Sequence, residues 1–246
     1  MSPEDRNAVT NAVTNGGSNA ISNASQTSTS VLVVKEVATE ENPFTSPAAP
    51  GDAIDAAAEA EIRADRAAMR LERFLARRPA RFAAPGELHP DLLAWTRRFL
   101  AGDHGNLVIT GSTGAGKSWS AWRIGEEILR SGYPGRVEVT KAYRFKRLAT
   151  PPADFAGIDR LASASLLVLD DIGAVRVSDW DADHLYGAID DRSEDMRPTI
   201  ITTNATAKRE EGRTLLQTLL GDRVASRIAE DVTIVILDGP DRRRSS

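Results

Sequence analysis

The 246-residue chain contains no cysteine, which excludes disulfides, thiolate zinc sites, iron–sulfur clusters and cysteine nucleophiles. Its only histidines are His89, His104 and His184, and their spacing does not match a metal site. No apolar run approaches the ~20 residues that a membrane span needs. The polar N-terminus MSPEDRN also lacks the apolar core of a secretory signal. We therefore expect a cytoplasmic protein that does not act at a membrane.

Apolar residues make up 41% of the chain and charged residues 27%, which is ordinary for a soluble globular protein. The length allows one or two domains. The formal net charge of −4 argues against a protein that coats nucleic acid with a wholly basic surface. It still allows a local basic patch, because net charge averages over all faces.

The first fifty residues differ in composition from the rest. Residues 7–30 are mostly Asn, Ser, Thr, Ala and Gly and cannot bury enough apolar surface to offset the entropy of ordering. We therefore expect a disordered tail and a Pro-rich linker over residues 1–50. Within it, the apolar residues 31–34 form either a short strand or docking element, or an isolated apolar patch.

Residues 51–80 are rich in Ala, Glu and Arg, which predicts a helical arm. Asp52 is the expected N-cap, and Pro79 marks the end. The arm carries one thin apolar stripe, which includes Ile62, Met69 and Phe74. A long helix with so narrow a stripe packs against something else, in this chain or in a partner protein.

Residues 81–246 alternate between short β-branched runs and helical patterns, which predicts an α/β domain with a parallel sheet sandwiched by helices. The expected strands lie near residues 106–110, 136–140, 166–170, 198–203 and 232–237. The expected helices lie near residues 90–100, 117–131, 142–148, 179–193 and 213–229.

The strongest motif follows the first predicted strand and opens a helix, with the pattern G-x-x-x-x-G-K-S. Its glycines let backbone N–H groups surround phosphate oxygens, and the helix N-terminus adds a positive end. Lys117 would reach the β- and γ-phosphates, and the Ser118 hydroxyl would hold Mg²⁺. The motif comprises Gly111, Ser112, Thr113, Gly114, Ala115, Gly116, Lys117 and Ser118.

A second motif, LLVLDD, ends the predicted strand near 166–170 with two carboxylates. Asp170 falls at the carboxyl end of that strand, where ligands bind in open α/β sheets. We expect Asp170 to bind Mg²⁺ and Asp171 to polarise the attacking water. The alternative is a strand that ends in an acidic turn.

A third motif, TIITTN, ends a buried strand with Asn204, an amide that can position a water or contact the γ-phosphate. A turn-forming Asn is the alternative. The fourth, GDRVASRI, places Arg223 and Arg227 on one helix face. A guanidinium there can stabilise transition-state charge on a neighbouring subunit's nucleotide. The alternative is a solvated or salt-bridged helix face.

These four motifs in this order resemble the DnaC/IstB family of AAA+ ATPases, which comprises bacterial helicase loaders and transposition helper ATPases. The segment LLVLDDIGAVRVSDW is similar to the double-Asp motif of that family, with Arg192 and Pro198 at matching positions further on. The likeness extends from about residue 78 to 242.

The resemblance implies an ATPase that uses ATP and Mg²⁺. Asp171 takes the place of the usual catalytic Glu, which predicts slow turnover. Asn204 corresponds to sensor 1 and Arg223 to the arginine finger, with Arg227 as second choice. Arg242 is a candidate for sensor 2. An arginine finger acting between subunits implies a homo-oligomer in the ATP state.

A basic patch with interleaved aromatic residues follows the second predicted strand, and it suits single-stranded DNA. Its cations are Lys141, Arg144, Lys146 and Arg147. The alternative is that Tyr143 or Phe145 anchors the helix in the core while the cations are solvated.

The leading hypothesis is an ATP-dependent loader that acts on a replicative DNA helicase and single-stranded DNA. A transposition helper on duplex DNA, a nucleotide-dependent adaptor without hydrolysis and a small-molecule kinase are the alternatives. The kinase leaves the double Asp, Asn204 and the GDRVASRI segment without a clear role.

Overall fold

The computed structural model describes residues 50–173, 179–205 and 214–238. There, five parallel strands form one sheet in the order β2-β3-β4-β1-β5. The central strands β3, β4 and β1 are largely buried between the helices, whereas Ile234 and Ile236 of the edge strand β5 are about half exposed. The predicted α/β fold, a parallel sheet sandwiched by helices, is therefore confirmed. The strands are β1 (Asn106–Gly111), β2 (Val137–Lys141), β3 (Leu166–Ile172), β4 (Thr199–Thr203) and β5 (Val232–Leu237).

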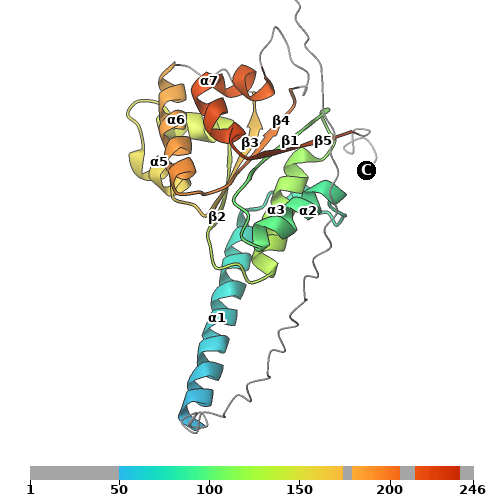
Figure 1. Ribbon diagram of the computed structural model, residues 1–246, viewed down its shortest axis with the longest axis vertical. Helices are drawn as coiled ribbons and strands as arrows, with labels where there is room; N and C mark the ends of the chain where they lie inside the picture. The colour runs from blue at the N-terminus through green and yellow to red at the C-terminus, as the bar shows by residue number, and fades with distance from the viewer. Residues whose placement is uncertain (1–49, 174–178, 206–213, 239–246) are drawn as a thin grey trace, which may run out of the picture. The chain divides into compact units, whose positions relative to one another are not determined.

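The helices form two layers, each with its own apolar cluster against the sheet (Figure 1). Helices α1 (Pro50–Arg77), α2 (Pro90–Leu100) and α3 (Lys117–Arg130) contribute to one cluster. A 3₁₀ turn at Ala80–Phe82 connects α1 to α2. The other cluster is built from α4 (Ala142–Ala149), α5 (Phe155–Ala162), α6 (Asp179–Glu194) and α7 (Leu215–Ala229). The strand and helix positions predicted for the domain match these elements to within a few residues.

Two sequence predictions need correction. Helix α5 was not expected, because eight residues after two prolines and with an internal glycine give little periodic signal. Asp154 nevertheless caps it, accepting a hydrogen bond from the Gly157 N–H at 2.9 Å. Helix α1 begins at Pro50 rather than after a cap at Asp52.

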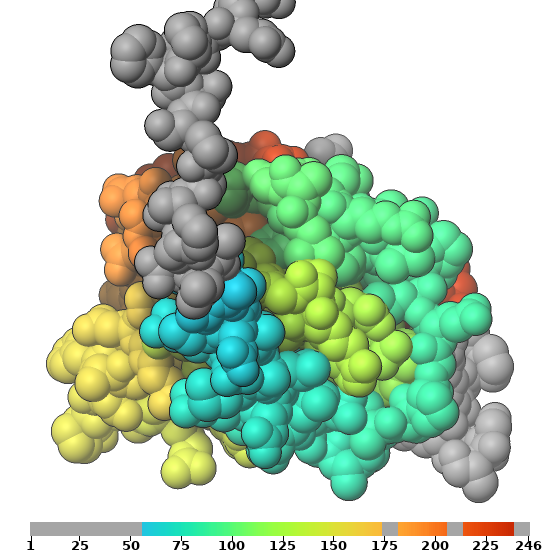
Figure 2. Space-filling model, turned by 90° about the horizontal axis from the view of Figure 1, so that it is seen from below, coloured from blue at the N-terminus to red at the C-terminus, as the bar shows by residue number. Residues whose placement is uncertain are grey.

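The C-terminal turns of α1 pack on α3, which lies beside α1 in Figure 2. Phe74 is 1% exposed, and its ring lies 4.9 Å from that of Trp122. Ile62 and Met69 are about half exposed. At ~100° per residue, Met69 lies ~140° around the helix from Phe74. The single apolar stripe predicted for this helix is therefore wrong, because its members lie on different faces.

An ion cluster also ties the end of α1 to the domain. Arg78 reaches the Glu126 carboxylate of α3 at 2.7 Å, beside Arg123 and Arg130. Burial raises the pKa of Glu126, but the hydrogen bond from Arg130 and the charges of Arg123 and Arg78 outweigh it, and the net pKa is lowered. The described residues from Pro50 to Asp238 belong to one compact unit, so a functional boundary between arm and domain at residue 80 stays a prediction.

Candidate nucleotide-binding site

The loop between β1 and α3 has a backbone that only certain residues allow. Gly116 caps α3 in the left-handed region, with φ of 98°. Gly111 has φ of 139°, and its Cα passes so close to β5 that an added Cβ would lie 2.1 Å from the carbonyl oxygen of Leu237. These two glycines let the chain turn from the end of β1 into the start of α3, where the first N–H groups of a helix have no partner within the helix.

Replacing Gly111 by Ala is expected to distort this loop, because its Cβ would overlap the β5 backbone, which cannot yield as a flexible side chain would. We expect a loss of about 1–3 kcal/mol in the free energy of unfolding and weakened ATP binding. Urea unfolding and nucleotide titration would measure both. The control is Gly102→Ala, where φ is also positive but the added Cβ meets no atom within 4 Å. Equal effects of the two substitutions would contradict the overlap argument.

Lys117 is the first residue of α3 and is only 7% exposed. Its Nζ donates hydrogen bonds to the carbonyl oxygens of Gly111 at 2.8 Å and Ser112 at 2.7 Å. The ammonium therefore lies within the loop, close to the space that the loop encloses. A lysine held in this way suits the β- and γ-phosphates of a nucleotide.

Asp170 is the last of five consecutive buried residues at the start of β3 and is 1% exposed. The Thr202 hydroxyl of β4 donates to Asp170 Oδ1 at 2.7 Å and accepts the N–H of Asp171 at 2.8 Å. Thr202 thereby holds both carboxylate residues in position. Sequence reasoning missed Thr202, although a hydroxyl inside an aliphatic strand is a signal that could have identified it.

Asp171 and Asn204 come together from neighbouring strands. Asp171 has φ of 65°, at a register shift between β3 and β4. Asp and Asn tolerate this conformation better than most residues. The Asn204 amide donates to Asp171 Oδ1 at 3.3 Å. The structure thus brings together the carboxylate and the amide that the sequence singled out separately.

The strand order explains why all these groups converge. Strand β4 lies between β3 and β1, and the carboxyl ends of parallel strands meet at one edge of the sheet. The phosphate loop, the two carboxylates and Asn204 therefore share that edge. The buried ammonium, the helix N-terminus and the carboxylates fit a magnesium nucleotide: the first two complement phosphate charge, and Asp170 with Ser118 offers oxygen ligands.

Comparison with known proteins agrees with this geometry. The model of the family described as IstB-like ATP binding protein matches residues 93–245, which is more than half of the chain. The chain belongs to this family. A putative ATP-binding protein of the insertion sequence IS1162 from Pseudomonas fluorescens is 33% identical over 100 residues. Those residues are 40% of this chain and 43% of the curated relative's length.

Solved structures support the same fold. The crystal structure of the DnaC helicase loader matches with a TM-score of 0.53 and 25% identity, over 65% of this chain and all of that chain. DnaI matches with a TM-score of 0.51 and 18% identity, over 68% of this chain and 95% of that chain. DnaA from Aquifex aeolicus, solved with the nucleotide analogue AMPPCP, has a TM-score of 0.50 and 18% identity, over 65% of this chain and 50% of that chain.

In this IstB-like protein the two candidate finger arginines have different surroundings. Arg223 is exposed, and its guanidinium lies 4.9 Å from the centre of the Tyr186 ring on α6. Arg227 forms an ion pair with Asp190 at 2.6 Å. The hydrogen bond with Tyr186 and the charge of Asp190 raise the pKa of Arg227. Arg227 is therefore held by its own chain, whereas Arg223 is the more accessible. Arg242 lies outside the described residues.

The basic patch on α4 has a mixed outcome. Tyr143, Arg144 and Arg147 are exposed, whereas Phe145 is buried in the core. The Arg144 side chain donates a hydrogen bond to the Tyr143 hydroxyl at 3.2 Å, which lowers the pKa of that phenol. Lys141 and Lys146 are half-buried. One aromatic ring and two exposed cations therefore remain as the surface that could meet a nucleic acid.

Proposed function

We propose that this IstB-like protein binds ATP with Mg²⁺ and hydrolyses it. Lys117 and the loop N–H groups contact the phosphates, Ser118 and Asp170 hold the magnesium ion, and Asp171 with Asn204 orients the attacking water. The observation that carries the proposal is the convergence of Lys117, Asp170 and Asn204 at one edge of the sheet.

Turnover is slow in this proposal, because the Asp171 carboxylate is one methylene shorter than a Glu and is also bound to Asn204. A multiple-turnover phosphate-release assay tests it. Sustained release of phosphate supports hydrolysis, whereas release of less than one equivalent per protein would favour an adaptor that only binds the nucleotide.

For the client, we propose a replicative DNA helicase together with single-stranded DNA. The likeness to the DnaC helicase loader, which spans all of that solved chain, supports this choice. The exposed Tyr143, Arg144 and Arg147 supply the DNA contact, and the exposed Ile62 and Met69 of α1 are available for the helicase. Across residues 50–173, 179–205 and 214–238, no helix is both long and apolar enough to span a membrane.

A transposition helper on duplex DNA is the second candidate. It is favoured by the IstB-like family match and by the likeness to a putative ATP-binding protein of an insertion sequence. Both candidates use the same nucleotide site, so the DNA form and the partner protein distinguish them. Two measurements separate the loader from the transposition helper. One is a pull-down of the host helicase by the full chain with ATP, and the other is filament formation on duplex DNA. Helicase capture and preference for single strands support the loader.

Arg223 is proposed to act on the nucleotide of a neighbouring subunit in an ATP-bound homo-oligomer. Arg223→Ala is then expected to lower turnover about 10³-fold or more while ATP binding is kept. Mixing the Arg223→Ala and Lys117→Ala variants gives the decisive measurement. At an interface between the two, the Arg223→Ala subunit supplies an intact nucleotide pocket and the Lys117→Ala subunit supplies an intact Arg223. Recovery of phosphate release in the mixture supports action between subunits. Arg227→Ala is the matched variant, and equal behaviour of the two would remove the assignment to Arg223.

A further inference from the structure

Helix α1 carries five arginines whose spacing alternates between three and four residues. At ~100° per residue, these positions fall within one face about 80° wide. The carboxylates Glu61, Asp65 and Glu72 fall on a different face. The row, which we call the arginine row, consists of Arg63, Arg66, Arg70, Arg73 and Arg77.

The ends of the arginine row are neutralised, but its middle is not. Arg63 pairs with Glu59 at 3.3 Å, and Arg77 pairs with the buried Glu138 at 2.6 Å. In the part of the chain that the structure describes, Arg66, Arg70 and Arg73 form no ion pair. The Nε of Arg70 is buried and has no hydrogen-bond acceptor there. Three charges on one helix face are therefore without an ion-pair partner among the described residues.

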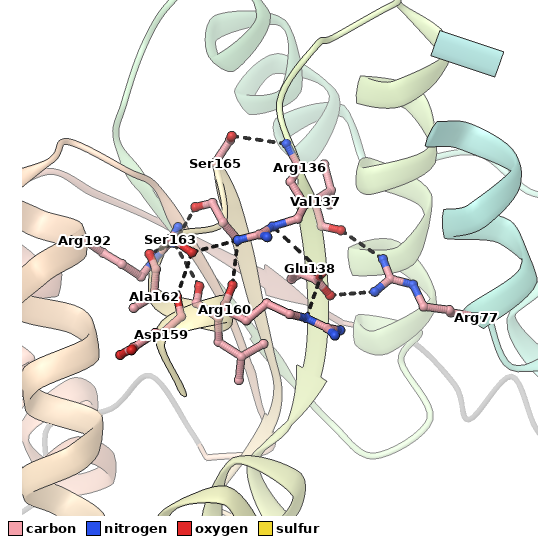
Figure 3. A network of polar contacts seen from close by, with 12 residues as sticks. Arg77, Arg136, Val137, Glu138, Asp159, Arg160, Ala162, Ser163, Ser165 and Arg192 are labelled. Atoms are coloured by element: carbon pink, nitrogen blue, oxygen red, sulfur yellow. Dashed lines mark hydrogen bonds and ion pairs between the residues drawn. The ribbon is translucent and has the colours of Figure 1, made fainter. Parts of the chain in front are cut away.

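A cleft of about 590 Å³ continues the row onto the domain. Arg70, Arg73 and Arg77 line it from α1, and Arg136 lines it from the start of β2. Figure 3 shows Arg77 and Arg136 on either side of Glu138, and Arg136 also donates to the Ser163 hydroxyl at 2.8 Å. Most of the remaining lining is apolar and includes Leu129 and Val137. The charged residues of the cleft are these four arginines and one carboxylate, which leaves a positive balance.

We propose that the arginine row binds the phosphodiester backbone of a nucleic acid, at a site separate from the patch on α4. The row spans about 21 Å along the helix axis, a length over which a duplex carries on the order of ten phosphate charges. A linear series of guanidinium groups matches such a repeating anion. A peptide with one or two carboxylates would leave most of the row unpaired.

The test uses the full chain with Arg66, Arg70 and Arg73 all changed to Gln, titrated by fluorescence anisotropy with a single strand and with a duplex. We expect affinity to fall about tenfold or more at moderate salt. The slope of log K against log salt should fall by about 2 on a single strand or nearly 3 on a duplex. The substrate that shows the drop identifies the form of nucleic acid bound.

Two further variants control for charge and folding. Changing the three residues to Lys keeps the charge and should retain most of the affinity and slope. Changing Arg81, Arg97 and Arg98 to Gln removes the same amount of charge around α2. This variant should keep an affinity and a salt slope close to those of the wild type. If the Gln variant keeps wild-type affinity and salt slope on both nucleic acids, the proposal is overturned. This holds even if the variant loses binding to a partner protein, because the row would then be a protein-binding site. The proposed ATPase function stands or fails separately, by phosphate release from these variants.

Discussion

Lys117→Ala is expected to lower ATP turnover on the order of 10²–10³-fold and to weaken ATP binding. The Lys117 ammonium is held inside the phosphate loop by the carbonyls of Gly111 and Ser112. These two hydrogen bonds hold the ammonium next to the loop that we propose binds the phosphates. An alanine leaves the loop N–H groups in place but removes this charge. Phosphate release and the binding of a fluorescent ATP analogue would measure the two effects.

The matched control is Arg97→Ala, which removes one positive charge from the exposed side of α2. It should leave turnover and binding unchanged. Far-UV circular dichroism of both variants would show whether the fold persists, since Lys117 is itself buried. Wild-type turnover in a folded Lys117→Ala variant would remove the loop from the proposed mechanism.

Arg192→Met is expected to reduce the free energy of unfolding by about 3–5 kcal/mol, because it removes the partner of several buried acceptors. The Arg192 side chain is 1% exposed and lies between the end of α5 and the start of β4. It donates to the carbonyl oxygens of Ala162 at 2.9 Å and Ala164 at 2.6 Å, to that of Pro198, and to the Thr199 hydroxyl at 3.0 Å. Urea unfolding monitored by circular dichroism would measure the loss.

The charge of Arg192 persists at neutral pH. Burial, with a smaller contribution from Arg197, lowers the pKa of Arg192 to about 9. Arg192→Lys keeps a charge but cannot reach all these acceptors, so it should recover only part of the stability. Arg197→Met serves as control, because Arg197 is half-buried, pairs with the exposed Asp195 and reaches the Ala162 carbonyl only at 3.5 Å. It should cost about 0–1 kcal/mol. An equal loss from Arg197→Met would show that the hydrogen bonds of Arg192 are not the cause.

The local elements of the domain were predictable because each has a short-range cause. Strands β1, β3 and β5 contain aliphatic runs, and α3 begins where Gly116 and Lys117 end the loop. Helix α5 was missed because eight residues contain little more than two turns. The prediction of a single apolar stripe on α1 was wrong for a different reason. Two faces of α1 carry apolar residues, and only the contact with Trp122 buries Phe74 while Met69 stays half exposed.

Candidate site residues were predicted from the sequence where a short motif is typical of one chemistry, as with the phosphate loop and the two consecutive aspartates. Thr202 was missed because its hydroxyl connects β4 to β3 by hydrogen bonds, and the sequence does not show which strands are neighbours. The surroundings of Arg223 and Arg227 were left open for the same kind of reason. Tyr186 and Asp190 are some forty residues away in sequence, and only the packing of α6 on α7 brings them close.

The amino-acid order alone therefore specified the phosphate loop, the strands around it and the likeness to a family, because glycine dihedral freedom and hydrophobic periodicity act within a few residues. The folded chain alone decided which strand ends adjoin, which arginines are paired and which face of α1 is left open. Those outcomes depend on contacts between distant segments, where burial and ion pairing select among arrangements that the local sequence allows equally.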